Sequence, residues 1–389
     1  MAALQTLVLS LQPPAGDRIF IPFVAAPVAG NSDIFVAGDV SYFMSGAMAL
    51  GAVIAAAVKR RDVAHPEVIV PAYTCPSVVA AVIGAGAIPR LVDLAPESAF
   101  WDCEELERSL SDNTVAIIGV NLFGIRQPQE RLASAARQAD ALFIEDDAQG
   151  FPELSATVHT RADATIFSFG RGKQLSILGG GAAVLNSSGP AADLGVTGDT
   201  AQYVPGRWLQ LSSKVLAYNI LRAPVFYRAV QNMTFLGIGK TVYKELDRPR
   251  EMDAVSRQFL HHNLKLQDPS PSKAEQVLRT AGPELSLSGF VDLPGHEVAG
   301  QSRRLARYPL LAKDRRARDR VVKELQQTGI GASIMYGRPL PAIDRVPEVI
   351  SKQGPFPRAE DFSERLFTLP VHRSLTKADI NAMCSVLLS

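Results

Sequence analysis

Cysteine is scarce in this chain: three occur among 389 residues, at Cys75, Cys103 and Cys384. Their wide separation argues against a disulfide framework and against a zinc site built from closely spaced cysteines. No metal site is predicted. Sparse, unpaired cysteine is typical of proteins in a reducing compartment, so we expect a cytoplasmic location.

The chain also lacks an excess of charge and long apolar runs. Its 40 basic side chains are balanced by 39 acidic ones, which gives no electrostatic case for binding nucleic acid. No run reaches the ~20 apolar residues of a transmembrane helix. The first apolar run, Leu4–Leu11, is short, follows no basic residue and precedes Pro13 and Pro14. We therefore expect a strand or a packed arm there rather than a signal peptide.

What the chain does have is an alternation of short apolar strands and helices. Strands are predicted at 67–70, 89–93, 115–120, 141–144, 164–167 and 182–185, and helices at 77–84, 103–110 and 130–139. Such alternation predicts an α/β domain whose largely parallel sheet is covered on both faces. The chain is long enough for two domains.

Another predicted helix, Ser45–Val58, is apolar on nearly every side and should be buried, with Ser45 as its N-cap. Its first residues, Gly46 and Ala47, are small, so an anion could approach the free amides of the first turn. A packed helix without a ligand is the alternative interpretation.

A lysine and a pair of aspartates follow neighbouring predicted strands. Lys173 lies between the last two strands, close to Gly179–Gly181, and the strand at 141–144 runs into Asp146 and Asp147. Open α/β sheets bind ligands at the carboxyl ends of their strands. A lysine that forms a Schiff base and a carboxylate that keeps a pyridine nitrogen protonated are what pyridoxal phosphate chemistry requires. For the acidic pair, helix capping is the alternative interpretation.

The alternation stops between Gly189 and Asp253. Within this stretch, Trp208–Arg228 has apolar residues at helical spacing: Leu209, Val215, Leu216 and Ile220. We expect a helical insert that packs on the body of the protein, with a role at a membrane surface as the alternative.

The last third of the chain has the pattern of a small α+β domain. Strands are predicted at 307–311 and 332–336, with a helix at 315–328 between them that ends at Gly329. A final helix should begin at Thr376, where Asp379 completes a capping box.

Several of these segments together resemble the DegT/DnrJ/EryC1/StrS family of sugar aminotransferases. The motifs that carry the resemblance are Ser45–Leu50, Val70–Cys75, Ile144–Gln149, Ser168-Phe169 with Lys173 and Gly179–Gly181, Gly329–Gly331 before Tyr336, and Leu369–His372. The resemblance implies the fold of aspartate aminotransferase (type I). A large pyridoxal phosphate-binding domain with a mostly parallel seven-stranded sheet would span residues 1–250, including an atypical helical insert at about 189–250. A smaller C-terminal α+β domain would span 251–389.

The resemblance also implies roles for individual residues at the cofactor. Lys173 would form the Schiff base, and Asp146 would hold the pyridine nitrogen, with Asp147 as its competitor because neighbouring strand residues point to opposite faces. Gln149 would lie near the phenolic oxygen. The phosphate would be held by the Ser168 hydroxyl and the amides of Gly46 and Ala47.

The sequence departs from the family at two points. Many relatives carry an aromatic residue at the position of Cys75, so either Cys75 or Tyr73 would lie against the cofactor ring. Relatives use an Asn or Arg of the neighbouring subunit to reach the phosphate, and here Arg250 is the candidate.

By this resemblance the protein is a homodimer with a shared active site that moves an amino group from L-glutamate to a keto-sugar nucleotide. A non-nucleotide ketone or aldehyde as the acceptor is the main alternative. A non-catalytic protein that binds pyridoxal phosphate and serves as a regulator or scaffold is the other.

Overall fold

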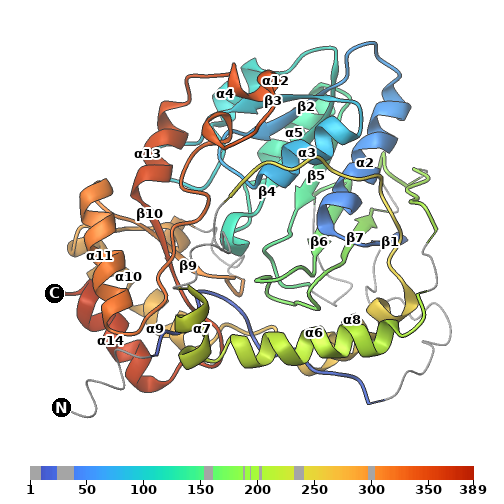
Figure 1. Ribbon diagram of the computed structural model, residues 1–389. Coiled ribbons are helices and arrows are strands. Elements are labelled where there is room, and N and C mark those ends of the chain that lie inside the picture. Colours follow the sequence, from blue (N-terminus) through green and yellow to red (C-terminus); the bar gives the residue numbers. More distant parts are fainter. Residues whose placement is uncertain are drawn as a thin grey trace.

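A seven-stranded sheet forms the centre of the larger part of the molecule (Figure 1). The computed structural model describes residues 10–23, 39–152, 161–186, 189–192, 194–200, 204–231, 241–296 and 303–389. The strand order is β1-β7-β6-β5-β4-β2-β3, and β7 alone is antiparallel to its neighbours. The strands are β1 (Asp39–Phe43), β2 (Glu67–Pro71), β3 (Ile88–Val92), β4 (Thr114–Val120), β5 (Leu142–Asp146), β6 (Ala164–Ser168) and β7 (Gly181–Leu185). The predicted α/β class with a mostly parallel sheet is confirmed.

Alternate strand residues pack under different helices. Val70, Ile118 and Ile144 belong to the core under α2 (Gly46–Arg61) and α3 (Pro76–Gly84), whereas Ile117 and Phe143 belong to the core under α4 (Cys103–Arg108) and α5 (Gln129–Gln138). Because side chains alternate along a strand, both faces of the sheet are apolar and need cover. The predicted helices in this region are all present.

The described residues between 204 and 266 include the helices α6 (Arg207–Leu221), α7 (Pro224–Gln231) and α8 (Ala254–Leu266). Helix α6 packs through Leu211 and Val215 against α8 and against residues of β6 and β7. Packing on the body was predicted, and Val215, one of the four apolar residues named for it, takes part in it. Leu209, Leu216 and Ile220, which were expected to take part in it, are exposed.

A second sheet, β10-β9-β8, organises the C-terminal part of the chain. Its strands are β8 (Val291–Asp292), β9 (Tyr308–Leu311) and β10 (Leu366–Leu369). The helices in this part of the chain are α9 (Lys273–Thr280), α10 (Gly282–Leu287), α11 (Arg315–Gln327), α12 (Glu348–Ser351), α13 (Pro357–Arg365) and α14 (Lys377–Leu387), of which α12 lies beside β3 of the large sheet (Figure 1). The capping box of Thr376 and Asp379 is present. The domain division at residue 250 stays a prediction.

The strand predicted at 332–336 is wrong. Ser333 makes a single β-bridge to Thr368, and the chain then turns, since Tyr336 and Gly337 have φ of 55° and 70°. A strand cannot continue through such left-handed backbone. The turn brings Tyr336 to the edge of the large sheet.

Most of the predicted N-terminal arm, residues 1–9, lies outside the described residues. Of the described residues that follow, Leu11 is buried and Gln12 forms a β-bridge to Ile330. Among the described helices, none is both long and apolar enough to cross a membrane.

Candidate active site

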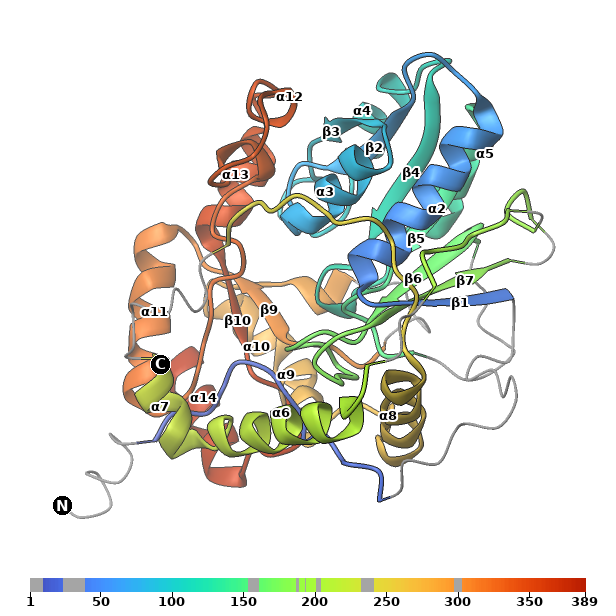
Figure 2. The ribbon, with the colours of Figure 1, turned by 45° about the vertical axis from the view of Figure 1, so that its right-hand side comes forward.

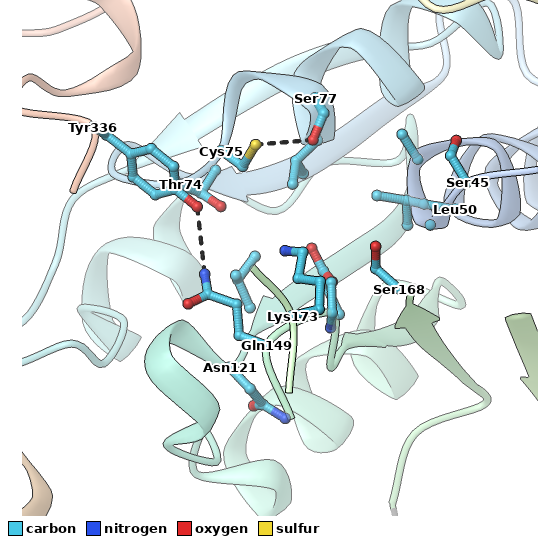
Figure 3. A pocket seen from close by; sticks show the side chains of 16 residues that line it. Ser45, Leu50, Thr74, Cys75, Ser77, Asn121, Gln149, Ser168, Lys173 and Tyr336 are labelled. Atoms are coloured by element: carbon cyan, nitrogen blue, oxygen red, sulfur yellow. Dashed lines mark hydrogen bonds between the residues drawn. The ribbon is translucent and has the colours of Figure 1, made fainter. Parts of the chain in front are cut away.

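A cavity of about 270 Å³ opens at the carboxyl ends of β2, β4 and β5, beside the first turn of α2. Seven of the residues predicted for the site line it: Gly46, Ala47, Cys75, Asp146, Gln149, Ser168 and Lys173. Figure 3 shows Lys173 and Gln149 on one side, with Thr74 and Cys75 on the other and Ser45 and Ser168 at one end. Residues as far apart in the sequence as Ser45 and Tyr336 thus meet in one place.

Two predicted residues do not line this cavity. Tyr73 is fully buried, donates a hydrogen bond from its hydroxyl to the Met335 carbonyl and packs against the rings of Tyr336 and Phe362. Arg250 has an exposed side chain, while its carbonyl accepts a hydrogen bond from the Met44 amide, just before α2. Of the two candidates for the cofactor ring, only Cys75 faces the cavity.

The two neighbouring aspartates have different surroundings. Asp147 forms a bidentate ion pair with Arg303 (3.0 and 2.7 Å) and accepts a hydrogen bond from the Asn121 amide. Asp146 faces the cavity and accepts a hydrogen bond from the Ala148 amide at 3.0 Å. In the described part of the chain, no basic side chain forms an ion pair with Asp146.

Burial raises the pKa of Asp146 to about 6, although the Ala148 amide and the nearby Lys173 charge act in the opposite direction. The negative charges of Asp147 and Glu145 contribute to the increase. A buried carboxylate without an ion-pair partner is costly. The carboxylate is therefore suited to a ligand that presents a protonated nitrogen.

The Lys173 side chain reaches the cavity from the loop between β6 and β7. Gly172, just before it, has φ of 79°, so this loop needs the left-handed backbone that glycine adopts without cost. The Lys173 amide donates to the Gly170 carbonyl, which closes the turn. Lys173 and Asp146 therefore lie at neighbouring strand ends and line the same cavity.

The end of the cavity beside α2 is an anion cradle. Ser45 caps the helix by accepting a hydrogen bond from the Met48 amide, and Gly46 and Ala47 lie in the first turn, where the helix itself supplies no acceptor for backbone amides. A Cβ on Gly46 would lie 2.7 Å from the Ser168 Cβ, so only glycine lets α2 approach Ser168 this closely. Free amides, a hydroxyl and a helix N-terminus together fit a phosphate group.

Four further polar side chains of the site were not predicted: Asn121, Thr74, Ser77 and Tyr336. The side-chain amide of Gln149 donates a hydrogen bond to the Tyr336 hydroxyl at 3.3 Å, and its side-chain oxygen accepts a hydrogen bond from the Phe123 amide. Burial raises the pKa of Tyr336 well above its usual value, so the hydroxyl stays protonated. The position of Asn121, directly after a parallel strand, was a signal that could have identified it.

The model of the DegT/DnrJ/EryC1/StrS aminotransferase family matches residues 40–220 and 279–388, which is most of the chain. The chain belongs to this family. It is an aminotransferase, as the resemblance predicted. The stretch that the model does not match contains α7 and α8.

Solved structures share the fold of this aminotransferase. A DegT/DnrJ/EryC1/StrS aminotransferase from Brucella abortus is 22% identical, with a TM-score of 0.63, and the match covers 99% of this chain and 93% of that one. The sugar aminotransferase Spr1654 from Streptococcus pneumoniae is 19% identical, with a TM-score of 0.63 for its PMP form, and the match covers 90% and 85% of the two chains. Spr1654 was also solved in a PLP form. The cofactor predicted here is therefore the one that this neighbour carries.

Among curated proteins, this aminotransferase is 27% identical to L-glutamine:2-deoxy-scyllo-inosose aminotransferase of Streptoalloteichus tenebrarius, over 59% of this chain and 55% of that protein. It is 32% identical to GDP-perosamine synthase of Escherichia coli O157:H7, over 31% and 34% of the two chains. One of these relatives is named for a cyclitol ketone and the other for a sugar nucleotide.

Proposed function

We propose that this aminotransferase holds pyridoxal phosphate in the 270 Å³ cavity and transfers an amino group from L-glutamate to a keto-sugar nucleotide. The observation that carries the proposal is the position of Asp146, which is buried beside Lys173 and has no ion-pair partner in the described part of the chain. When bound, pyridoxal phosphate supplies an electron sink that makes a neighbouring C–H bond acidic.

The residues of the cavity fit this cofactor by their chemistry. The amides of Gly46 and Ala47 and the Ser168 hydroxyl would bind the phosphate, and Asp146 would hold a proton on the pyridine nitrogen. Gln149 donates to Tyr336, and together they would orient the phenolic oxygen. The Cys75 sulfur would lie against the ring, where an aromatic side chain is common among relatives.

The Lys173 amine is the group that would be joined to the cofactor and that would move the proton during transfer. It would remove a proton from the substrate carbon that carries the amino nitrogen. It would then deliver that proton to the cofactor carbon bonded to the same nitrogen. The cavity walls would fix which C–H bond lies in position for this transfer, a positioning effect that contributes several kcal/mol.

A nearby arginine supports substrates that carry a negative charge. Arg307 is half-buried, donates to the Ser333 hydroxyl at 3.3 Å and forms no ion pair in the described part of the chain. Its charge acts on Tyr336, which lines the cavity, and burial lowers the pKa of Arg307. We infer that Arg307 binds the carboxylate of the amino donor or a phosphate of the acceptor.

The test of the donor is the half-reaction. Protein loaded with pyridoxal phosphate should lose its visible colour when L-glutamate is added and should release 2-oxoglutarate. L-Glutamine is the matched alternative, because one relative is named for it. If no amino acid changes the colour, the proposed transfer is wrong. Borohydride treatment should fix the cofactor on Lys173, as mass analysis of peptides would show, whether or not turnover occurs.

A non-nucleotide ketone is the second candidate acceptor. It is favoured by the longer match to the relative named for 2-deoxy-scyllo-inosose than to the perosamine synthase. Incubating the amine-loaded protein with keto-sugar nucleotides and with cyclitol ketones separates the two candidates. Return of colour with one class alone identifies the acceptor.

We propose in addition that the enzyme is a homodimer in which Arg250 reaches the phosphate in the partner's cavity. Support comes from the exposed side chain of Arg250 and from its position beside the start of α2.

A further inference from the structure

Helices α6 and α7 expose an apolar surface that no described part of the chain covers. It consists of Leu209, Leu216, Ile220, Leu221, Val225 and Phe226, whose exposed fractions lie between 47% and 65%. We call it the α6–α7 apolar surface. Most of the other exposed large apolar side chains in the described residues are scattered over distant elements. Clustering of this kind marks a contact site rather than ordinary surface variation.

All charged side chains of the same segment are basic. Between Thr200 and Lys244 the sequence has six basic residues and no aspartate or glutamate, whereas the remaining residues hold 34 basic against 39 acidic side chains. Arg222 and Arg228 donate to uncharged oxygens, and Lys214 is exposed without an ion pair in the described structure. Arg207 is paired with Asp253 at 3.1 Å, so the charges on α6 and α7 that have no acidic partner in the described structure are those of Lys214, Arg222 and Arg228.

The position of the two helices leaves them open to a large flat partner. Figures 1 and 2 both show α6 and α7 along the outer edge of the molecule, on the side opposite α2 and α3. The inner side of α6 is held by Leu211 and Val215, so the outer side can be occupied without unfolding the helix.

We propose that the α6–α7 apolar surface docks on an anionic lipid bilayer. Apolar side chains on one face of a helix enter the boundary between headgroups and acyl chains, and flanking basic residues bind anionic headgroups. A two-fold contact with a second copy would instead place the basic segments of both copies against one another. Their like charges would repel, which disfavours that contact. Charge complementarity therefore favours the bilayer. This inference does not depend on the substrate proposed above.

Flotation of the full-length protein with vesicles tests the proposal. We expect binding to vesicles of phosphatidylcholine mixed with phosphatidylglycerol, little binding to phosphatidylcholine alone, and weaker binding at high salt. The variant Leu216→Gln/Ile220→Gln should bind about tenfold more weakly or worse, because it removes two side chains that would enter the bilayer. Lys214→Glu should have an effect of similar size.

Matched controls are available elsewhere on the surface. Leu287→Gln, on α10, changes a side chain that is 89% exposed, and Lys323→Glu, on α11, reverses an exposed charge. Both should bind vesicles like the unchanged protein, and circular dichroism should show that all variants fold. The proposal is overturned if the protein does not float, or if the α6 variants float like the controls. If Leu216→Gln/Ile220→Gln changes the oligomeric state instead, the surface is a contact between copies and the proposal is equally wrong.

Discussion

At the scale of single residues, Asp146 and Asp147 differ because one has a cation beside it and the other faces a cavity. Arg303 comes from a segment more than 150 positions away, and it makes Asp147 part of a buried ion pair. Asp146 keeps its carboxylate available for a ligand. The same type of residue, one position apart, thus serves stability in one case and binding in the other.

Asp146→Asn should stabilise the protein free of cofactor at neutral pH. The pKa of about 6 in the folded state lies above the ordinary 3.8, so ionisation at this position disfavours the folded state. The cost is absent below pH 3.8, grows between 3.8 and 6, and reaches about 3 kcal/mol above pH 6. Urea unfolding at pH 7 should therefore show a more stable variant, and the difference should vanish near pH 4. The same variant should lose about 10²-fold or more in turnover.

Asp147→Ala should have the opposite effect on stability. Removing one partner of a buried ion pair leaves Arg303 uncompensated and costs about 3–5 kcal/mol. Urea unfolding measures this loss directly. If Asp147→Ala unfolds like the unchanged protein but no longer binds pyridoxal phosphate, the roles assigned here to Asp146 and Asp147 are reversed.

Arg307→Met should weaken the binding of an anionic substrate. Losing a charged hydrogen bond costs about 1.5–3 kcal/mol, so we expect KM to rise about tenfold to a hundredfold, while stability stays the same or improves. Steady-state kinetics with donor and acceptor varied in turn would show which substrate depends on Arg307. Arg338→Gln, at an exposed arginine that pairs with Asp344, is the control. Equal effects of both variants would argue against a specific role for Arg307.

At the scale of elements, the start of α2 is determined by its contact with the end of β6. Ser45 provides the cap, and the absence of a side chain at Gly46 lets the helix approach Ser168. Gly181 shows the same requirement, because a Cβ there would lie 2.4 Å from the Gly46 nitrogen. The anion cradle therefore depends on two glycines from different elements.

Gly46→Ala should separate α2 from Ser168 and weaken cofactor binding. Inserting a methyl group into such a close contact costs about 1–3 kcal/mol. Titration with pyridoxal phosphate, followed by absorbance, should show lower affinity. Gly84→Ala, at the end of α3, is the control, since its Cβ would meet its nearest neighbour at an ordinary 3.6 Å. Unchanged affinity in Gly46→Ala would contradict the assignment of the cradle.

At the scale of the whole molecule, the cavity lies where two parts of the chain meet. The large sheet supplies Asp146 and Ser168 from β5 and β6, and the C-terminal part supplies Tyr336 by the turn that replaces the predicted strand. A third contribution, from a second copy, is the proposed role of Arg250.

Mixed dimers test that role. Lys173→Ala and Arg250→Ala should each be nearly inactive alone. If Arg250 acts in the partner's site, mixing the two variants under conditions that exchange subunits should restore activity, because one of the two sites in a mixed dimer has both residues. Light scattering should show the dimer. A monomer in solution, or no restoration after proven exchange, would rule out the shared site.

Much of the fold was predictable because its signals are local. The strands at 115–120 and 164–167, the Ser45 cap and the Thr376 capping box each depend on residues close together in sequence. The helical insert was predicted as well, but its exposed face was not, since the period of apolar residues does not say which side meets the protein. Helix α8 and strand β1 had no comparable pattern and were missed.

The sequence by itself determined the alternating α/β order and the placement of a lysine and a carboxylate at strand ends. Strand length, helix caps and glycine turns each depend on residues that are neighbours in the sequence. Tertiary structure alone decided which aspartate is paired by Arg303, that Tyr336 joins the cavity while Tyr73 does not, and that α6 and α7 leave an apolar surface open. Those outcomes depend on side chains distant in the chain, and only folding brings such side chains into contact.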